Sequence, residues 1–472
     1  MSYEEQVQQL FRTDPGFASA VRLLEKLNKL KHPRVLNFSH HDLDGITSAF
    51  IVRRLLERYL DAEVVTKLPP YFKLSEESLR ETLEGEGRFD LLLLTDKGTF
   101  GYYDDFLKYI DRVLILDHHP LDGRPKRCTV LNPSADRPVP AAASLLCHML
   151  TTKLDPTDNY DDFAALIGCR GDFAFDPVQK TSVDFVRPFI ERAREKFPHA
   201  FEIKLERPTM FDLLNKDRTV LINQIGEVLH AGCLAHLYNQ TLGIDIPYGP
   251  ELVFNFLLEL AKRRDRPAEF RTIADVLGRM PKGQMLSRVF EQYKSDWNML
   301  NRRAENTVFL DEIRDVGIYM LFAEEAPAMQ ATQFPAILPF VASTRLDELK
   351  LAGGHSHVML TIFCPKERGV HISMRGGGGV LDCGAMCYQL ASHLRDLYPE
   401  REGIGGGGHD RAAECVVDKP VPMYAVMHEL LALVQEMSRI AKALESGEVT
   451  REDAEKARLL RLDRNLNVDS VS

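Results

Sequence analysis

The sequence predicts an α/β protein of two domains, the first built on a parallel sheet. The chain has 472 residues, 44% of them hydrophobic, which is more than one compact core usually holds. Between residues 35 and 116 short apolar runs alternate with helical patterns, and polar clusters follow three of these runs. Such alternation predicts right-handed crossovers, a buried parallel sheet and a ligand site beyond the carboxyl ends of its strands.

An amphipathic helical region opens the chain. Apolar residues recur at near-helical spacing from residue 4 to 31, around a break at Asp14-Pro15-Gly16. The apolar runs that follow are short enough for strands, and the segments between them are long enough for helices. Strands are expected at 35–38, 64–68, 91–94 and 113–116, and helices at 46–60, 75–83 and 103–110.

The rest of the chain divides into an annex, a linker and a second domain. Helical patterns dominate from about residue 175 to 283, so we expect a helical annex within a first domain of residues 1–283. Residues 284–314 are charged with helically spaced apolar positions, which predicts a linker helix. Strand patterns return in a smaller mixed α/β domain of residues 315–446, and residues 447–472 form a charged tail with a disordered end.

Charge and composition limit the partners. The formal net charge is -10, so the chain lacks the basic field that drives tight binding of long nucleic acid. Eight cysteines form no CxxC pair, which is typical of buried thiols in a reducing compartment. The first residues lack the features of a signal peptide, and the apolar runs are too short to span a bilayer. We therefore expect a cytoplasmic protein without a membrane partner.

The cluster SHHDLDG follows the first predicted strand. On an extended strand alternate side chains share a face, so His40, Asp42 and Asp44 are expected to point the same way. Gly45 then allows a tight turn into a helix that begins near Ile46. Asp44 could alternatively cap that helix, which is the commoner role of a single aspartate before a helix.

Further acidic and imidazole side chains follow the next predicted strands. Asp96 ends the leucine run, and Asp117-His118-His119 ends the run at 113–116, so these groups should converge at one edge of the sheet. Unpaired carboxylates at this density would repel one another, and divalent cations relieve that repulsion. Mixed oxygen and imidazole ligands favour two Mn²⁺ ions, with zinc, iron or Co²⁺ as alternatives and with Mg²⁺ as a substitute that the nitrogen ligands disfavour. Two such ions can activate a shared water for attack on a phosphoryl group.

These motifs resemble the DHH phosphoesterase superfamily, in particular the branch with a C-terminal DHH-associated domain that includes RecJ-type exonucleases and nanoRNases. The resemblance covers residues 34 to about 175 and about 315 to 445. It implies that Asp96 bridges two metals, that His118 is a metal ligand, and that His119 contacts the substrate phosphate as an acid partner. The ligand set is then His40, Asp42, Asp44, Asp96, His118 and Asp172, with His119, Asp96 and His118 as catalytic residues.

Asp172 rests on this resemblance, as the aspartate that follows a helix in the fourth motif. Asp176 lies close by, and local periodicity cannot choose between the two, although the Gly171-Asp172 context favours the first. Lys97 departs from the family pattern. It either attracts phosphate or points outward from its loop, and the sequence leaves both interpretations open.

The second domain resembles the substrate-binding domain of the same branch. Arg375, in Ser373-Met374-Arg375, resembles a phosphate clamp, and the run that ends in His409 resembles a glycine-rich substrate-binding signature. Glycines expose backbone N–H groups to an anion, and a guanidinium group can bind it through two hydrogen bonds. The expected substrate-binding residues are His119, Arg375, Gly406, Gly407, Gly408 and His409.

The function expected first is hydrolysis of terminal phosphodiester bonds in short single-stranded oligonucleotides or dinucleotides, with release of nucleoside monophosphates. The acidic net charge favours short substrates over long DNA or RNA. Four alternatives remain: a RecJ-type 5′–3′ exonuclease of single-stranded DNA, hydrolysis of cyclic dinucleotides, a phosphoanhydride hydrolase similar to pyrophosphatases and exopolyphosphatases, and a scaffold relative without activity. Relatives are often dimers, so a homodimer is a further expectation.

Overall fold

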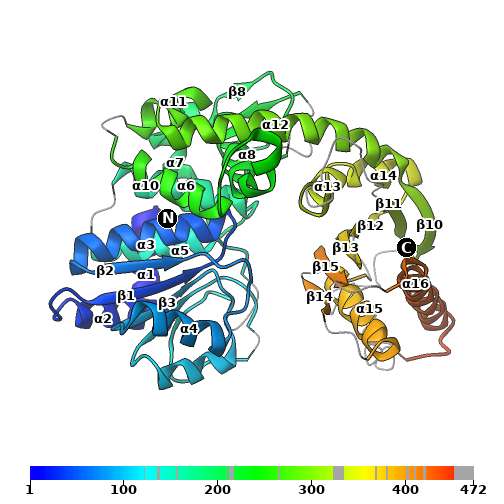
Figure 1. Cartoon of the computed structure of the whole chain (residues 1–472), viewed down its shortest axis with the longest axis horizontal. Coiled ribbons are helices and arrows are strands. Elements are labelled where there is room, and N and C mark those ends of the chain that lie inside the picture. The colour runs from blue at the N-terminus through cyan, green and yellow to red at the C-terminus, as the bar shows by residue number, and fades with distance from the viewer. Residues whose placement is uncertain are drawn as a thin grey trace. The chain divides into compact units, whose positions relative to one another are not determined.

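The computed structural model divides the chain into two compact units, Met1–Glu291 and Gln292–Ser472 (Figure 1). It describes residues 1–121, 123–134, 139–155, 158–208, 210–211, 217–263, 266–322, 334–366, 369–378, 381–399, 403–408, 411–417 and 421–450. The predicted α/β class, with a parallel first sheet and a mixed second sheet, is confirmed. The end of the predicted tail, from residue 451, lies outside the described residues. None of the described helices is long and apolar enough to cross a membrane.

The first unit contains a five-stranded sheet in which every neighbouring pair is parallel. The strand order is β2-β1-β3-β4-β5, so the chain moves outward on one side of β1 and then on the other. The leucine run forms the central strand because a strand covered on both faces is apolar at every position. The last strand was not predicted, since its three residues are too few to give a pattern. The bounds are β1 Arg34–Ser39, β2 Glu63–Lys67, β3 Leu91–Thr95, β4 Val113–Leu116 and β5 Thr129–Leu131.

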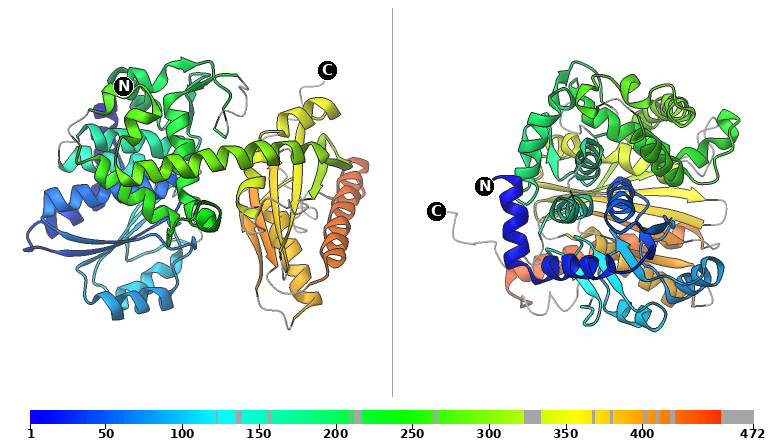
Figure 2. Two further views of the ribbon diagram at one scale, coloured as in Figure 1. Left: turned by 45° about the horizontal axis from the view of Figure 1, so that its top comes forward. Right: turned by 90° about the vertical axis from the view of Figure 1, so that its left-hand side faces the viewer.

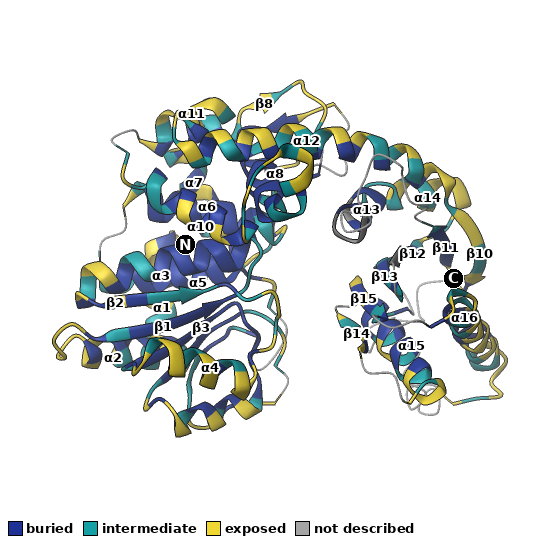
Figure 3. Cartoon of the chain, in the orientation of Figure 1, coloured by how far each residue is buried: buried dark blue, intermediate teal, exposed yellow. Residues whose placement is uncertain are grey.

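Helices cover both faces of this sheet. Helices α3 (Leu43–Leu60) and α5 (Ala143–Leu154) lie on one face, and α4 (Glu76–Glu86) lies on the other (Figure 1). Leu79 of α4 and Phe106 of the 3₁₀ helix η1 (Gly101–Lys108) belong to the same buried cluster as Leu92 of β3. Strands β3 and β4 are buried along their whole length (Figure 3), so the polar side chains that follow them lie beyond the strand ends.

Helices precede and follow the sheet. At the chain start α1 (Tyr3–Thr13) and α2 (Pro15–Leu27) are separated at the predicted break, because Asp14 caps the second helix through the N–H of Phe17. After the sheet come α6 (Asn159–Gly171) and the predominantly helical annex. Its elements are β6 Phe175–Asp176, β7 Thr181–Ser182, α7 Arg187–Lys196, η2 Pro198–Phe201, β8 Ile203–Lys204, β9 Thr219–Val220, α8 Leu221–Cys233, η3 Ala235–Tyr238, α9 Asn239–Leu242, α10 Gly249–Leu260, η4 Pro267–Glu269 and α11 Ile273–Leu277.

Helix α12 (Pro281–Arg303) contains the division between the two units. The prediction of a helix as far as residue 314 is wrong, because after the 3₁₀ turn η5 (Ala304–Asn306) residues Val308–Ile313 form strand β10. This strand lies at the edge of its sheet, and its first two residues are exposed, so it lacks the alternation that identifies a strand.

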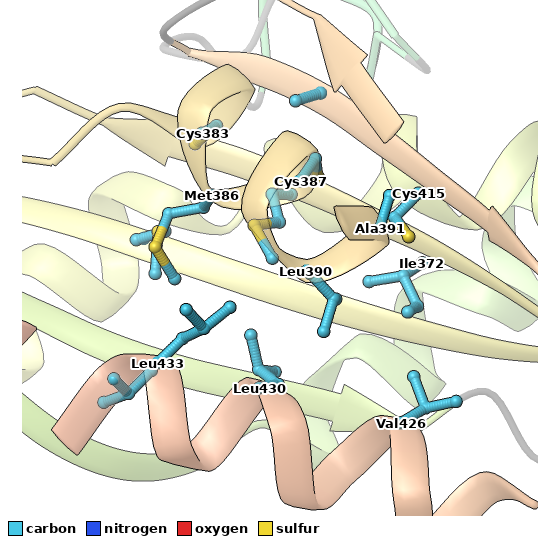
Figure 4. Close-up of a cluster of buried hydrophobic side chains, with 14 of the residues drawn as sticks. Ile372, Cys383, Met386, Cys387, Leu390, Ala391, Cys415, Val426, Leu430 and Leu433 are labelled. Carbon is cyan, nitrogen blue, oxygen red and sulfur yellow. The ribbon is translucent and has the colours of Figure 1, made fainter. Parts of the chain in front are cut away.

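The second unit contains a six-stranded mixed sheet of order β10-β11-β12-β13-β15-β14, in which only the β11–β12 pair is parallel among the described strands. Helices α15 and α16 bury one face, where Leu390 and Leu430 meet Ile372 (Figure 4). Helix α16 runs along one side of the strands, and α13 and α14 lie on the other side (Figures 1 and 2). The bounds are β11 Val316–Phe322, α13 Phe334–Ser343, α14 Leu346–Gly353, β12 His357–Lys366, β13 Gly369–Gly377, α15 Cys383–Leu397, β14 Ile404–Gly408, β15 Ala412–Val417 and α16 Met423–Ser446.

A buried polar network attaches the first helix to the body of the first unit. The Tyr3 hydroxyl lies 2.6 Å from Nδ1 of His148, and Nε2 of the same imidazole lies 2.7 Å from Oδ1 of Asp162. Arg192 and Lys196 pair with the Asp162 carboxylate. Because every member except the two cations is almost fully buried, the network holds α1, α5, α6 and α7 in one arrangement.

Replacing Tyr3 by Phe removes one end of this network and leaves an imidazole nitrogen buried without that partner. We expect the Tyr3→Phe variant to lose about 1–3 kcal/mol in free energy of unfolding, measured by urea denaturation followed by circular dichroism. Tyr109→Phe is the matched control, because the Tyr109 hydroxyl bonds Glu76 at an exposed position. Equal stability of the two variants would show that the network contributes nothing.

The same network makes stability depend on acid pH. Burial alone would raise the pKa of Asp162, but His148, Arg192 and Lys196 lower it to about 2. Its pKa in the unfolded chain is about 3.9, so the carboxylate stabilises the fold fully above about pH 4 and ceases to do so as pH falls toward 2. We expect the stability difference between wild type and Asp162→Asn to shrink over that interval. A difference that stays constant from about pH 7 to about pH 2.5 would contradict this.

Candidate active site

The predicted site residues meet where the order of the first sheet reverses. Strands β1 and β3 are neighbours, and the connections that leave them run to opposite sides, which is the position where open α/β sheets bind ligands beyond the carboxyl ends of their strands. His40 and Asp42 follow β1, Asp96 follows β3, and residues 117–119 follow β4. The topology therefore brings these side chains together from segments that are distant in sequence.

The first motif reaches the site by a different route from the one predicted. Strand β1 ends at Ser39 and α3 begins at Leu43, so the expectation of an extended segment with three side chains on one face is wrong. Asp42 is the N-cap of α3, and its Oδ1 accepts the N–H of Gly45 at 2.9 Å. Gly45 thus lies inside the helix, and it must be glycine because a Cβ there would lie 2.4 Å from the carbonyl oxygen of His40.

Asp44 also caps a helix, but not the one expected. Its two carboxylate oxygens accept the N–H groups of Ala143 at 2.6 Å and Ser144 at 3.0 Å, at the start of α5. The side chain is fully buried, and burial together with the Asp172 and Asp96 carboxylates raises its pKa well above the usual value. A buried carboxylate in this position is held by a helix N-terminus, where negative charge is favoured.

Asp96 lies between two imidazoles. Its Oδ2 is 3.7 Å from Nδ1 of His40, and its Oδ1 is 3.4 Å from Nε2 of His118. Nδ1 of His40 also lies 2.9 Å from Oδ2 of Asp42, while Nε2 of His118 lies 2.9 Å from Oδ2 of Asp172 and 3.9 Å from Asp44. The site is therefore two imidazole–carboxylate clusters that share one aspartate.

The structure distinguishes between the two candidates for the fourth aspartate. Asp172 ends α6 and reaches the His118 imidazole, whereas Oδ1 of Asp176 accepts the N–H groups of Val178 and Gln179 at 2.8 Å in a local turn. Helix α6 can approach so closely because residue 171 is glycine, where a Cβ would lie 2.8 Å from the Cβ of Leu43. Asp172 is thus the aspartate that the fold brings to the site.

The donor set fits divalent cations. Neither oxygen of Asp96 nor Nε2 of His118 has a hydrogen bond among the described residues, although all three atoms are buried. Burial lowers the pKa of an imidazole, yet Asp42 and Asp96 raise the pKa of His40 to about 10, and Asp172 and Asp96 raise that of His118. Without cations, protons on the imidazoles balance the carboxylates. Metal binding would displace those protons and use the same atoms as ligands.

Within the part of the chain that the structure describes, three groups of side chains place their donor atoms close enough together to hold an ion. They are His40 with Asp42 and Asp96, Asp44 with His118 and Asp172, and Asp96 with His118 and His119.

Residues 34–168 match the model of the DHH family, N-terminal domain. This part of the first unit, which carries most of the candidate site, is therefore similar to the N-terminal domain of DHH-family proteins.

Two solved structures share the fold of this chain. Exonuclease RecJ bound to manganese is 19% identical, with 88% of this chain and 94% of that chain covered and a TM-score of 0.55. RecJ of Thermus thermophilus in complex with Mn²⁺ is 18% identical, with 91% of this chain and 55% of that chain covered and the same TM-score. An uncharacterised protein of Methanocaldococcus jannaschii is 26% identical over 171 residues, which span 33% of this chain and 38% of that protein.

A network of hydrogen bonds surrounds His119, the last residue of the Asp117-His118-His119 motif. Nδ1 of His119 lies 2.9 Å from Oδ1 of Asp117, whose Oδ2 accepts hydrogen bonds from Thr99 at 2.7 Å and Asn132 at 3.2 Å. Asn132 also donates to the carbonyl of His119. Burial opposes protonation, but Asp117 and Asp96 raise the pKa of His119. These hydrogen bonds fix the orientation of this imidazole. Sequence reasoning assigned no role to Thr99, because nothing marks a threonine in a loop as a partner of this aspartate.

The loop between β2 and α4 closes one side of the site. Phe72 packs edge-to-face against His40 and His119, with ring centroids 5.3 and 4.9 Å apart. Lys97 is fully buried, and its ammonium group bonds the carbonyl of Tyr71, so it does not point outward from its loop. Burial lowers the pKa of Lys97 to about 8. This lysine connects the turn at Asp96 to the loop between β2 and α4 through Tyr71, a contact that no local pattern predicts.

The remaining substrate-binding predictions fall in the second unit. Arg375 donates to the carbonyl of Ala413 at 3.2 Å and pairs with Oε1 of Glu414 at 3.3 Å. The glycine run lies in strand β14, and a Cβ at Gly406 would lie 2.1 Å from the carbonyl oxygen of Cys387. Gly407 and Gly408 adopt positive φ within this strand, at 154° and 144°. His409 lies outside the described residues.

Metal binding should stabilise the first unit. We expect Mn²⁺ to raise the free energy of unfolding by about 2.7 kcal/mol at a free concentration about 100 times its dissociation constant. Asp172→Asn should weaken this stabilisation because it removes a carboxylate from the site. Asp176→Asn is the matched control and should retain it. Thermal unfolding with and without Mn²⁺ measures the effect, and loss of stabilisation in the control alone would reverse the assignment.

Proposed function

We propose that this protein is a manganese-dependent two-metal phosphodiesterase that hydrolyses terminal phosphodiester bonds of short single-stranded oligonucleotides or dinucleotides to nucleoside monophosphates. The observation that carries the proposal is Asp96, a buried carboxylate that presents one oxygen to each of two imidazole–carboxylate clusters. That is the arrangement expected of a ligand shared between two ions. The proposed ligands are His40, Asp42 and Asp96 for one ion, and Asp44, His118, Asp172 and Asp96 for the other.

The site residues suggest how the reaction would proceed. Two bound ions would lower the pKa of a shared water and neutralise charge on the phosphoryl group. Hydrogen bonds at the starts of α3 and α5 hold the carboxylates of Asp42 and Asp44 in fixed positions, so little reorganisation is needed during the reaction. His119, oriented by Asp117, is the proposed group that contacts the phosphate and donates a proton to the leaving oxygen. No covalent protein nucleophile is required.

The substrate class is inferred from charge. A net charge of -10 disfavours long polyanions, because their binding depends on many cationic contacts. Residues 315–446 are the proposed substrate-binding domain, in which Arg375 would exchange Glu414 for a substrate anion. Single-stranded DNA exonuclease activity is the second candidate, because this chain shares the fold of the exonuclease RecJ.

Product analysis on end-labelled RNA and DNA oligomers of different lengths, with Mn²⁺, separates these functions. We expect nucleoside monophosphates and faster turnover of the shortest substrates. Equal or faster turnover of long single-stranded DNA would favour the RecJ-type activity, and orthophosphate release from pyrophosphate would indicate a phosphoanhydride hydrolase. Both results contradict the proposal.

Substitution of His119 tests the proposed acid. We expect His119→Gln to lower kcat by about 10²–10⁴-fold, because the amide cannot donate a proton in the same way. Metal-dependent thermal stabilisation should persist in this variant, because His119 is not among the proposed metal ligands. Asp176→Asn serves as the control and should keep full activity. Unchanged kcat in His119→Gln would exclude the role.

A further inference from the structure

Phe173, directly after Asp172, has a backbone conformation that its side chain does not favour. Its φ is +52°, in the left-handed region that bulky residues rarely adopt and that costs of order 1–3 kcal/mol. The strain is not the result of burying the ring, since 48% of the residue is exposed. A conformation that costs free energy and places an aromatic ring in solvent needs another explanation.

The ring has a rigid support beneath it. The Arg170 guanidinium carbon lies over the Phe173 ring, 4.9 Å from its centroid, and over the Phe211 ring at the same distance. Arg170 is itself held by hydrogen bonds to Asn223, to the carbonyl of Phe175 and to the carbonyl of Phe211. The Phe211 ring also packs against Phe173, with ring centroids 5.2 Å apart. Arg170 and Phe211 thus support the ring, and the part of Phe173 that stays exposed is available to a flat partner.

The place of residue 173 in the chain, next to Asp172, suggests that partner. Consecutive Cα atoms are about 3.8 Å apart, so Phe173 lies within one residue of the carboxylate that contacts His118 at 2.9 Å. A ring held beside a phosphodiester site suits a nucleobase, because every base has a π-face that can stack on it. A phosphoanhydride substrate such as pyrophosphate has no group that would use it.

We propose that Phe173 is a stacking platform for the base of the nucleotide whose phosphodiester occupies the Asp96–His118–Asp172 site. This inference rests on the proposed phosphodiesterase function and extends it, because it assigns the residue that recognises the nucleoside. Stacking of this kind tolerates any base identity. The enzyme should therefore discriminate between nucleotides that have a base and those that lack one, rather than among the four bases.

Binding can be measured without turnover. The probes are trinucleotides with phosphorothioate linkages that carry 2-aminopurine at one end or the other, bound to the full chain with Mn²⁺. We expect the wild type to quench the fluorescence of one probe. Phe173→Leu and Phe173→Asn should quench less and bind about 5- to 100-fold more weakly, and Phe173→Trp should restore quenching.

The variants separate stacking from folding. Asparagine tolerates positive φ, so Phe173→Asn keeps the backbone even if Phe173→Leu unfolds, and circular dichroism checks both. Phe309→Leu is the matched control, because Phe309 is 49% exposed, and it should bind like the wild type. As an independent readout, kcat/KM is measured for an oligonucleotide whose terminal nucleotide has a base and for one whose terminal nucleotide is abasic. The ratio of the first value to the second should fall toward one in Phe173→Asn.

Two results would overturn the inference. If Phe173→Asn folds, binds and quenches like the wild type while the wild type cleaves oligonucleotides, the platform is wrong and the proposed phosphodiesterase stands. If the wild type cleaves no phosphodiester with Mn²⁺ but folds and binds the metal, the proposed function fails and the stacking role fails with it.

Discussion

The rest of the structure depends on the repulsion among Asp44, Asp96 and Asp172, three carboxylates gathered at one sheet edge. In a low-dielectric interior such groups cannot all be ionised without compensation, and burial raises the pKa of Asp44 and Asp172. Compensation comes from the N-terminus of α5, from the imidazoles and from any bound cation. The fold must supply enough rigidity to prevent the carboxylates from moving apart.

Each part of the first unit contributes to that rigidity. The strand order brings β1 and β3 side by side, and glycines at 45 and 171 allow α3 and α6 to approach within contact of neighbouring segments. The annex contributes through Arg170, which connects the end of α6 to Asn223 of α8 and to Phe211. The annex thus acts as a support for the turn that carries Asp172, a role that its sequence pattern does not show.

Sequence reasoning predicted what depends on local pattern and missed what depends on distant contacts. Leucine runs and acidic clusters predicted the strands and their polar ends, because periodicity and strand-end chemistry are local. The motif at 40–44 was placed correctly, but its geometry was wrong, because α3 begins at Leu43, before the motif ends, and not near Ile46. The glycine run at 405–408 was not recognised as part of strand β14, since packing against Cys387, a contact outside any local pattern, selects the glycine at 406.

Two residues of the site share a backbone conformation that strand and helix patterns never predict. Asp96 has φ +57° and Phe173 has φ +52°, and each lies at the end of an element that carries a carboxylate into the site. Aspartate tolerates this conformation, whereas phenylalanine does so at a cost. Such strain persists only where surrounding contacts determine it. A buried cationic side chain lies next to each residue: Lys97 follows Asp96 and bonds the carbonyl of Tyr71, and Arg170 lies over the ring of Phe173. The buried side chains of Lys97 and Arg170 thus have similar positions in the structure. Each connects a left-handed turn beside the site to a neighbouring segment, and so helps to hold the side chains that would face the substrate.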